Sequence, residues 1–245
     1  MPTNGTTLSV LQSAASEMAL PEFGSAAGNI QQIPKQLLSL YNMTGEMLVK
    51  RRVWRLLWRE HSFDAISGQA EYPLPPDFAR PISQTEWDKT NRWPMIGPET
   101  PQQWQWLKSG ILSTGPRERF LLKGNNMEIW PVPGSDTVPT PVTISYMYIS
   151  RWWVETADGQ PKQKADRDDD TCVFDDRLMI SGVKLRYYQA KGFDTSAFAS
   201  DFQNNIDDAM AQDGGAPILS LARSVQYPLI SVWSIQDGNF PGPTT

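Results

Sequence analysis

Hydrophobic and polar positions alternate in the middle of the chain, which is typical of a β-strand. In residues 142–149, Val142, Ile144, Tyr146 and Tyr148 occupy every second position. Each of these side chains would point to the same face of a sheet, because successive residues of a strand face opposite sides. The pattern therefore predicts a strand over 142–149.

A second β signal lies in residues 119–133, where two apolar runs stand on either side of Gly124-Asn125-Asn126. Glycine and asparagine tolerate the positive φ that a tight turn requires, so the segment predicts a β-hairpin. A hairpin alone is marginally stable in water. The strand at 142–149 is its clearest expected partner.

Four further segments carry apolar residues every three to four positions, which predicts helices. We expect these helices to begin near Thr7, Pro34, Phe174 and Asp194 or Thr195, and to end near Pro21, Arg59, Gly192 and Gly214. Asp175 and Asp176 would favour the start of the third helix, because negative charge is stabilising at a helix N-terminus.

The order of these segments predicts an α+β protein that is mainly α. It has a four-helix bundle core, an inserted antiparallel β-rich region and an extended C-terminal arm. Residues 1–61 and 172–215 are expected to form the core, 62–154 the proline-rich β insertion, 155–171 a polar loop and 216–245 the arm.

Composition narrows the class of protein. The chain has 245 residues, of which 40% are hydrophobic and 20% charged, an ordinary globular balance. Its formal charge of −5 argues against a surface that holds nucleic acid, although it suits a surface that lets DNA pass. A single cysteine, Cys172, excludes an internal disulfide. We find no signal peptide and no apolar window of the roughly 18 residues that a membrane span needs, so we expect synthesis in the cytoplasm.

Candidate catalytic residues are few. His61 is the single histidine, and any serine or cysteine nucleophile would depend on it as a base. Cys172 precedes a predicted helix, whose N-terminus would lower the thiol pKa, yet a free cysteine is also a common core residue. Structural roles are favoured for both, and we expect no catalytic residue.

An acidic stretch is the one candidate metal site. Asp168, Asp169, Asp170, Asp175 and Asp176 offer the oxygen ligands that Ca²⁺ or Mg²⁺ prefers, but they lack the order of a calcium-binding loop. A solvated loop before a capped helix is the favoured interpretation. We expect no metal and no cofactor.

The order of two helices, a β insertion, two helices and a long arm resembles the head-to-tail adaptor proteins of tailed phages, the tail tubular A family of short-tailed viruses. The resemblance covers nearly the whole chain. Its carriers are residues 8–21, 55–60, 121–133, 175–188 and 198–210. The chain departs from the shortest members by a larger, Trp-richer insertion and a longer arm.

The resemblance implies a structural virion protein rather than an enzyme. Such adaptors form a dodecameric ring at the head-tail junction, assembled in the host cytoplasm. The ring lies beneath the portal protein, continues the channel for genomic DNA without sequence-specific binding, and receives the tail nozzle protein. No membrane is involved.

Three groups of residues are candidates for contacts with these partners. The arm carries apolar residues that we expect to dock on the portal or on a neighbouring subunit: Tyr227, Leu229, Ile230, Val232, Trp233 and Ile235. The four residues Trp104, Trp106, Trp152 and Trp153 are expected contacts on the tail side, because interfaces are enriched in tryptophan.

The third group is a basic stripe. Arg51, Arg55 and Arg59 follow one another at intervals of four, which would place them on one helix face. They suit salt bridges with an acidic neighbouring subunit, and they also suit a phosphate track along DNA or a merely solvated face.

Two other functions remain open from the sequence. A carbohydrate- or host-surface-binding virion module would use exposed tryptophans as stacking platforms, at Trp104 and Trp106 or at Trp152 and Trp153. A hydrolase would require carboxylates such as Glu60, Asp64 or Glu128 to converge in the fold.

Overall fold

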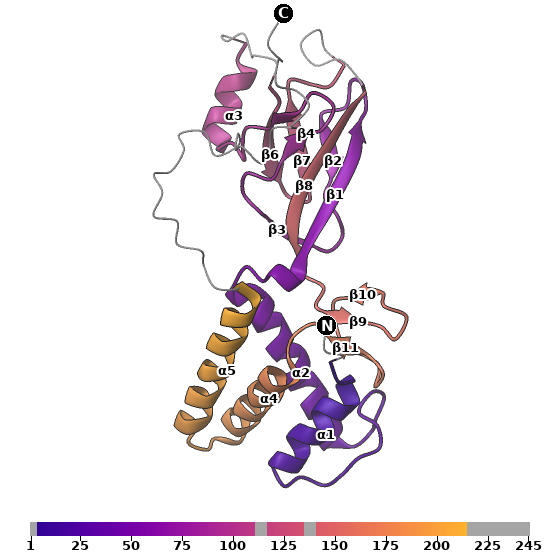
Figure 1. The fold of residues 1–245 in the computed structure, drawn as a ribbon, viewed down its shortest axis with the longest axis vertical. Coiled ribbons are helices and arrows are strands. Elements are labelled where there is room, and N and C mark those ends of the chain that lie inside the picture. The colour runs from indigo at the N-terminus through magenta and orange to yellow at the C-terminus, as the bar shows by residue number, and fades with distance from the viewer. Residues whose placement is uncertain (1–3, 111–116, 135–140, 215–245) are drawn as a thin grey trace, which may run out of the picture. The chain divides into compact units, whose positions relative to one another are not determined.

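The computed structural model describes residues 4–110, 117–134 and 141–214, and the predicted arm at 216–245 lies outside them. The chain through Gly214 forms one compact unit. Its described residues are 39% helical and 23% strand, in five α-helices and three antiparallel sheets (Figure 1). The prediction of a mainly α four-helix bundle is therefore wrong, because the sheets form a large part of the fold and have a core of their own.

Four helices form a helical layer: α1 (Thr7–Glu17), α2 (Gln32–Arg51), α4 (Asp176–Lys191) and α5 (Ser196–Gly214). Helix α4 packs against α1, α2 and α5. Asp175 caps α4, since its carboxylate accepts hydrogen bonds from the backbone N–H groups of Arg177 and Leu178. Gly192, with φ of 77°, ends α4. The predicted boundaries of this helix are confirmed.

Helix α2 ends at Arg51, and the prediction that it continues to Arg59 is wrong. Arg52 has an extended backbone, and a short 3-10 helix, η1 (Arg55–Leu57), leads directly into strand β1 (Trp58–Ala65). Trp54 and Leu57 are buried in the core of the helical layer all the same. The apolar spacing thus correctly predicts that Trp54 and Leu57 face the core. An extended residue and a 3-10 helix, rather than a continuous α-helix, place them there.

The largest sheet contains β1, β8 (Val142–Ser150), β4 (Trp87–Asp88) and β5 (Trp93–Pro94) in that order, with β3 (Phe78–Pro81) also paired to β8. Strands β1 and β8 are antiparallel over their length, from the pair Trp58 and Ile149 to the pair Ala65 and Val142. The predicted strand at 142–149 is confirmed as β8.

The predicted hairpin is confirmed as β6 (Arg119–Lys123) and β7 (Asn126–Trp130), with Gly124 at φ of 60° in the turn. Its hydrogen-bonded partner is β2 (Glu71–Pro73) rather than residues 142–149, so that part of the prediction is wrong. The hairpin meets β8 through side chains instead. Apolar residues of the two sheets share one core that includes Phe120, Ile129, Ile144 and Tyr146.

Two smaller features complete the fold. Helix α3 (Pro101–Lys108) begins with a capping box formed by Thr100 and Gln103. A third sheet, in the order β10 (Pro161–Lys162), β9 (Val154–Glu155) and β11 (Thr171–Cys172), lies in and beside the predicted polar loop.

Candidate interaction surfaces

The three arginines of the predicted basic stripe lie on three different elements. Arg51 is in α2, Arg55 in η1 and Arg59 in β1, so they do not share a helix face. The guanidinium group of Arg51 donates to the side chain of Gln203, and that of Arg59 donates to the carbonyl of Trp58 at 3.2 Å. Among the residues that the structure describes, none of the three arginines forms an ion pair.

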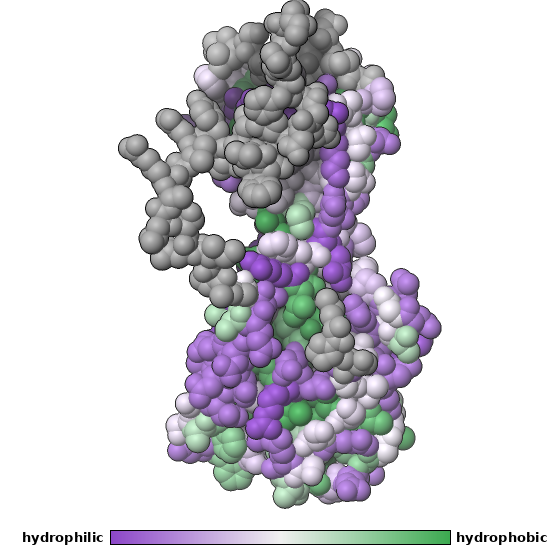
Figure 2. Space-filling view, in the orientation of Figure 1, coloured by the Kyte–Doolittle hydropathy of each residue, from purple (hydrophilic) through white to green (hydrophobic). Residues whose placement is uncertain are grey.

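Arg55 and Arg59 nevertheless line the same hollow, which has a volume of about 780 Å³ and is also lined by Leu56, Glu155 and Asp213. The carboxylate of Asp213 accepts hydrogen bonds from the backbone N–H groups of Arg55 at 3.0 Å and Leu56 at 3.2 Å. Leu56, which also lines this hollow, is exposed. The face shown in Figure 2 carries apolar patches among the hydrophilic surface of the helical layer.

The four candidate tryptophans divide into two buried and two accessible side chains. Trp153 is fully buried in the core of the helical layer, and Trp104 lies on the buried face of α3. Trp152 is half-buried, and Trp106 is 53% exposed. Trp106 lines a shallow hollow with Gln102 and Gln103. Of the four, Trp106 and Trp152 therefore retain surface for contacts.

The carboxylates of the hydrolase alternative are not brought together. Glu60 forms an ion pair with Lys89 at 2.6 Å, and Asp64 accepts a hydrogen bond from Thr143 at 2.8 Å. Glu128 lies in the other sheet and pairs with Lys108. The hydrogen bond from Lys89 lowers the pKa of Glu60, the direction opposite to that required of a general acid.

Neither His61 nor Cys172 has the surroundings of a catalytic group. Burial raises the pKa of the Cys172 thiol to about 12, which disfavours the reactive thiolate. The ring of His61 contacts the rings of Phe63 and Tyr146. Burial lowers the pKa of His61, and the charge of Asp77 opposes that shift. The described ranges 4–110, 117–134 and 141–214 contain no cluster of His, Cys, Asp and Glu that could hold a metal ion.

The acidic stretch has a structural role that the sequence does not predict. The carboxylate of Asp168 accepts hydrogen bonds from the hydroxyl of Ser25 at 2.6 Å and from the N–H groups of Ala26 at 2.9 Å and Ala27 at 2.8 Å. Asp170 is fully buried and pairs with Lys162 at 2.5 Å. The expectation of a simply solvated loop is wrong for these two residues. Asp168 fixes the segment between α1 and α2 to the loop before β11. Asp170 ties that same loop to Lys162 of β10.

A buried carboxyl pair is also missed by the sequence patterns. Asp88 of β4 and Glu118, which precedes β6, are 0% and 1% exposed. Burial and the neighbouring charge of Asp88 raise the pKa of Glu118 to about 7. Asp88 accepts two hydrogen bonds from Asn91, at 2.9 and 2.6 Å. Glu118 therefore titrates near neutral pH inside the fold.

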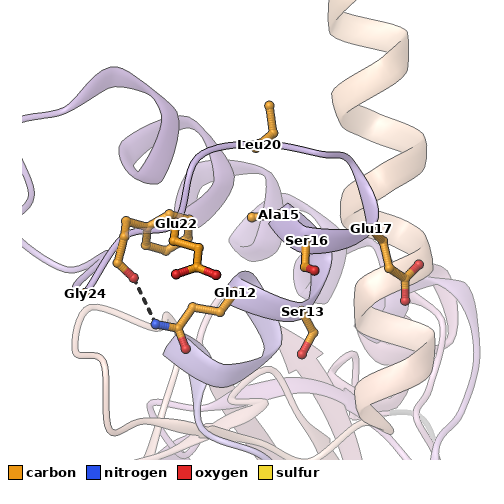
Figure 3. A pocket seen from close by; sticks show the side chains of 9 residues that line it. Gln12, Ser13, Ala15, Ser16, Glu17, Leu20, Glu22 and Gly24 are labelled. Atoms are coloured by element: carbon orange, nitrogen blue, oxygen red, sulfur yellow. Dashed lines mark hydrogen bonds between the residues drawn. The ribbon is translucent and has the colours of Figure 1, made fainter.

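A hollow of about 750 Å³ lies beside α1, between that helix and the segment that follows it (Figure 3). Ala15, Leu20 and Phe23 contribute apolar surface, and Gln12 donates a hydrogen bond to the carbonyl of Phe23 at 2.9 Å. Glu22 lies next to Gln12 in this view. The periodicity of α1 gives no sign of this hollow, because it depends on how the following segment turns back.

Comparison with known proteins places the chain in a family. A family model described as SU10 adaptor protein matches residues 6–224 of the chain. A search of curated proteins finds no match to the chain. Within the described residues, no helix is long and apolar enough to cross a membrane.

Proposed function

Because the chain belongs to the SU10 adaptor protein family, we propose that this phage structural protein is one subunit of a ring between the portal and the tail nozzle. The resemblance to head-to-tail adaptors is confirmed at the level of the family. The position of the ring, its copy number of twelve, its location at the head-tail junction and its two partners form the proposal.

The extent of the family match is the observation that supports this proposal most strongly. The match runs from residue 6 to residue 224 and so includes the helical layer and all three sheets. It therefore reflects the complete described architecture rather than one motif. A fold matched over this length is a better guide to function than a short pattern of apolar residues.

In the ring, the DNA channel would be formed by many copies of an acidic chain. A net charge of −5 per copy disfavours tight binding of the phosphate backbone, which suits a channel through which genomic DNA moves. Arg55 and Arg59, which form no ion pair in the described part of the chain, are proposed to meet acidic groups of the adjacent subunit, with Arg51 at the margin of the same contact.

Trp106 and Trp152 are proposed contacts on the tail side, because Trp106 is exposed and Trp152 is only half-buried. The carbohydrate-binding alternative loses support, since a sugar platform would use adjacent exposed rings. Trp104 and Trp153, the partners that it would need, are both buried.

The arm is proposed to attach the ring to the portal through Tyr227, Leu229, Ile230, Val232, Trp233 and Ile235. Burying the apolar side chains of such a segment against a partner is favourable, which stabilises the bound state. Deletion of residues 224–245 should leave the unfolding transition of the remaining chain unchanged and abolish binding to the portal protein. Normal portal binding by the truncated chain would contradict this assignment.

A further inference from the structure

We infer that the loop between α4 and α5, which carries Phe193, docks into the hollow beside α1 of the next copy of the chain. This inference rests on the proposed ring and adds the lateral contact that would close it. A ring requires a heterologous interface, in which two different surfaces of the subunit meet.

The first of these surfaces is an aromatic projection at the end of α4. Phe193 is 63% exposed, although an apolar side chain of this size is usually covered. It is held in place from within, because its ring contacts Tyr188, which stacks on Phe198 at 4.4 Å between centroids. The projection is therefore ordered before it meets a partner, which reduces the entropy lost on binding.

The second surface is the hollow of about 750 Å³ beside α1. Its apolar floor includes Leu20 and the buried ring of Phe23. Its rim is acidic. Glu17 is held within its own chain by Lys184 at 2.6 Å, whereas Glu22 forms no ion pair among the residues of known placement.

Charge and position make the two surfaces complementary. Lys191, two residues before Phe193, is exposed and forms no ion pair in the described ranges, so it can meet Glu22 of the neighbour when Phe193 enters the hollow. Helix α4 packs against both α1 and α5, and Figure 1 shows α1 and α5 on opposite flanks of the helical layer. The contact can therefore repeat from one copy to the next.

Disulfide trapping between two full-length variants tests this contact. One variant carries Lys191→Cys and the other carries Glu22→Cys, with tags of different length. The native Cys172 is buried and does not interfere. The two are mixed with the phage's portal protein and oxidised. We expect a covalent heterodimer in the mixture and none from either variant alone.

The matched control replaces the first variant with Asp207→Cys, an exposed position on α5.

The outcomes separate the inference from the proposed function. A ring that forms without the expected heterodimer, or with equal trapping by the control, overturns the inference and leaves the ring proposal intact. If neither wild-type chains nor variants form a ring on the portal, the proposed function and the inference both fail.

A second comparison does not depend on trapping. Phe193→Ser should raise the protein concentration needed for ring formation by about tenfold or more, because a central aromatic contact is lost. Ile66→Ser removes an apolar side chain of similar exposure, 60%, from the turn after β1 and should leave that concentration unchanged. Equal effects of both changes, or no effect of Phe193→Ser, would overturn the inference.

Discussion

Gly45 of α2 lies directly against the indole ring of Trp153. A Cβ atom at position 45 would overlap the ring, so the helix has no room for any other residue there. Trp153 also contacts Tyr41 and Phe174, with ring centroids 5.6 and 6.5 Å away. Glycine weakens the interior of a helix, but at position 45 it is required by the packing between α2 and the segment that follows β8.

Gly45→Ala is therefore expected to destabilise the protein, although alanine favours a helix by about 1 kcal/mol over glycine. Overpacking a filled core costs about 1–3 kcal/mol, and the rigid indole cannot move aside. The free energy of unfolding, measured in urea, should fall by this amount or more. Gly24→Ala is the control, since a Cβ there meets no atom within 4 Å. Equal stability of Gly45→Ala and wild type would contradict this account of the contact.

Asp168→Ala should destabilise the fold by about 2 kcal/mol, because it leaves the hydroxyl of Ser25 and the partly buried N–H groups of Ala26 and Ala27 without an acceptor. Burial opposes ionisation of Asp168, but these three hydrogen bonds lower its pKa. Its contribution to stability is thus present above the unfolded-state pKa of about 4 and is lost as the pH falls through the lower folded value. Urea unfolding at pH 7 and pH 3 measures both effects.

The control for this prediction is the adjacent residue. Asp169 is exposed, so Asp169→Ala should change the free energy of unfolding by no more than about 0.5 kcal/mol. If the two substitutions behave alike, the hydrogen bonds of Asp168 do not hold the loop as described.

The raised pKa of Glu118 should make the free energy of unfolding fall as the pH rises, the opposite direction to the effect of Asp168. Its folded pKa of about 7 lies above its ordinary value of 4.5, so the folded state holds a proton that the unfolded state releases. Stability from this group is complete below pH 4.5 and declines as the pH rises to 7, by up to about 3 kcal/mol. Glu118→Gln should remove this decline.

Unfolding midpoints measured between pH 4.5 and pH 8 test the assignment. Glu71→Gln, which changes an exposed carboxylate, should retain the decline of the wild type. An unchanged slope in Glu118→Gln would show that another group titrates.

The sequence predicts an element best where nearby residues both mark its ends and stabilise them. The β6–β7 hairpin follows from the residues of its own turn, and the ends of α4 follow from Asp175 and Gly192. The false extension of α2 shows the limit. Trp54 and Leu57 keep a helical spacing, but no glycine or proline marks the extended backbone at Arg52. In β1, exposed Glu60, Ser62 and Asp64 alternate with less exposed residues. This period of two is the sequence pattern that indicates a strand here.

The candidate surfaces are less predictable, because they depend on contacts between distant segments. Burial of Trp153 depends on Gly45, more than a hundred positions earlier. The role of Asp168 depends likewise on Ser25 and the two residues after it. The sequence shows how many tryptophans and aspartates there are. It does not show which of them are buried in the core or hydrogen-bonded within a loop.

The most direct test of the proposed function is the solution mass of the full-length chain, alone and mixed with the phage's portal protein. Light scattering after size exclusion gives this mass without labels or substitutions. We expect the mixture to yield a complex that contains the portal ring and multiple copies of this chain. A chain that stays folded but never joins the portal would contradict the proposed function.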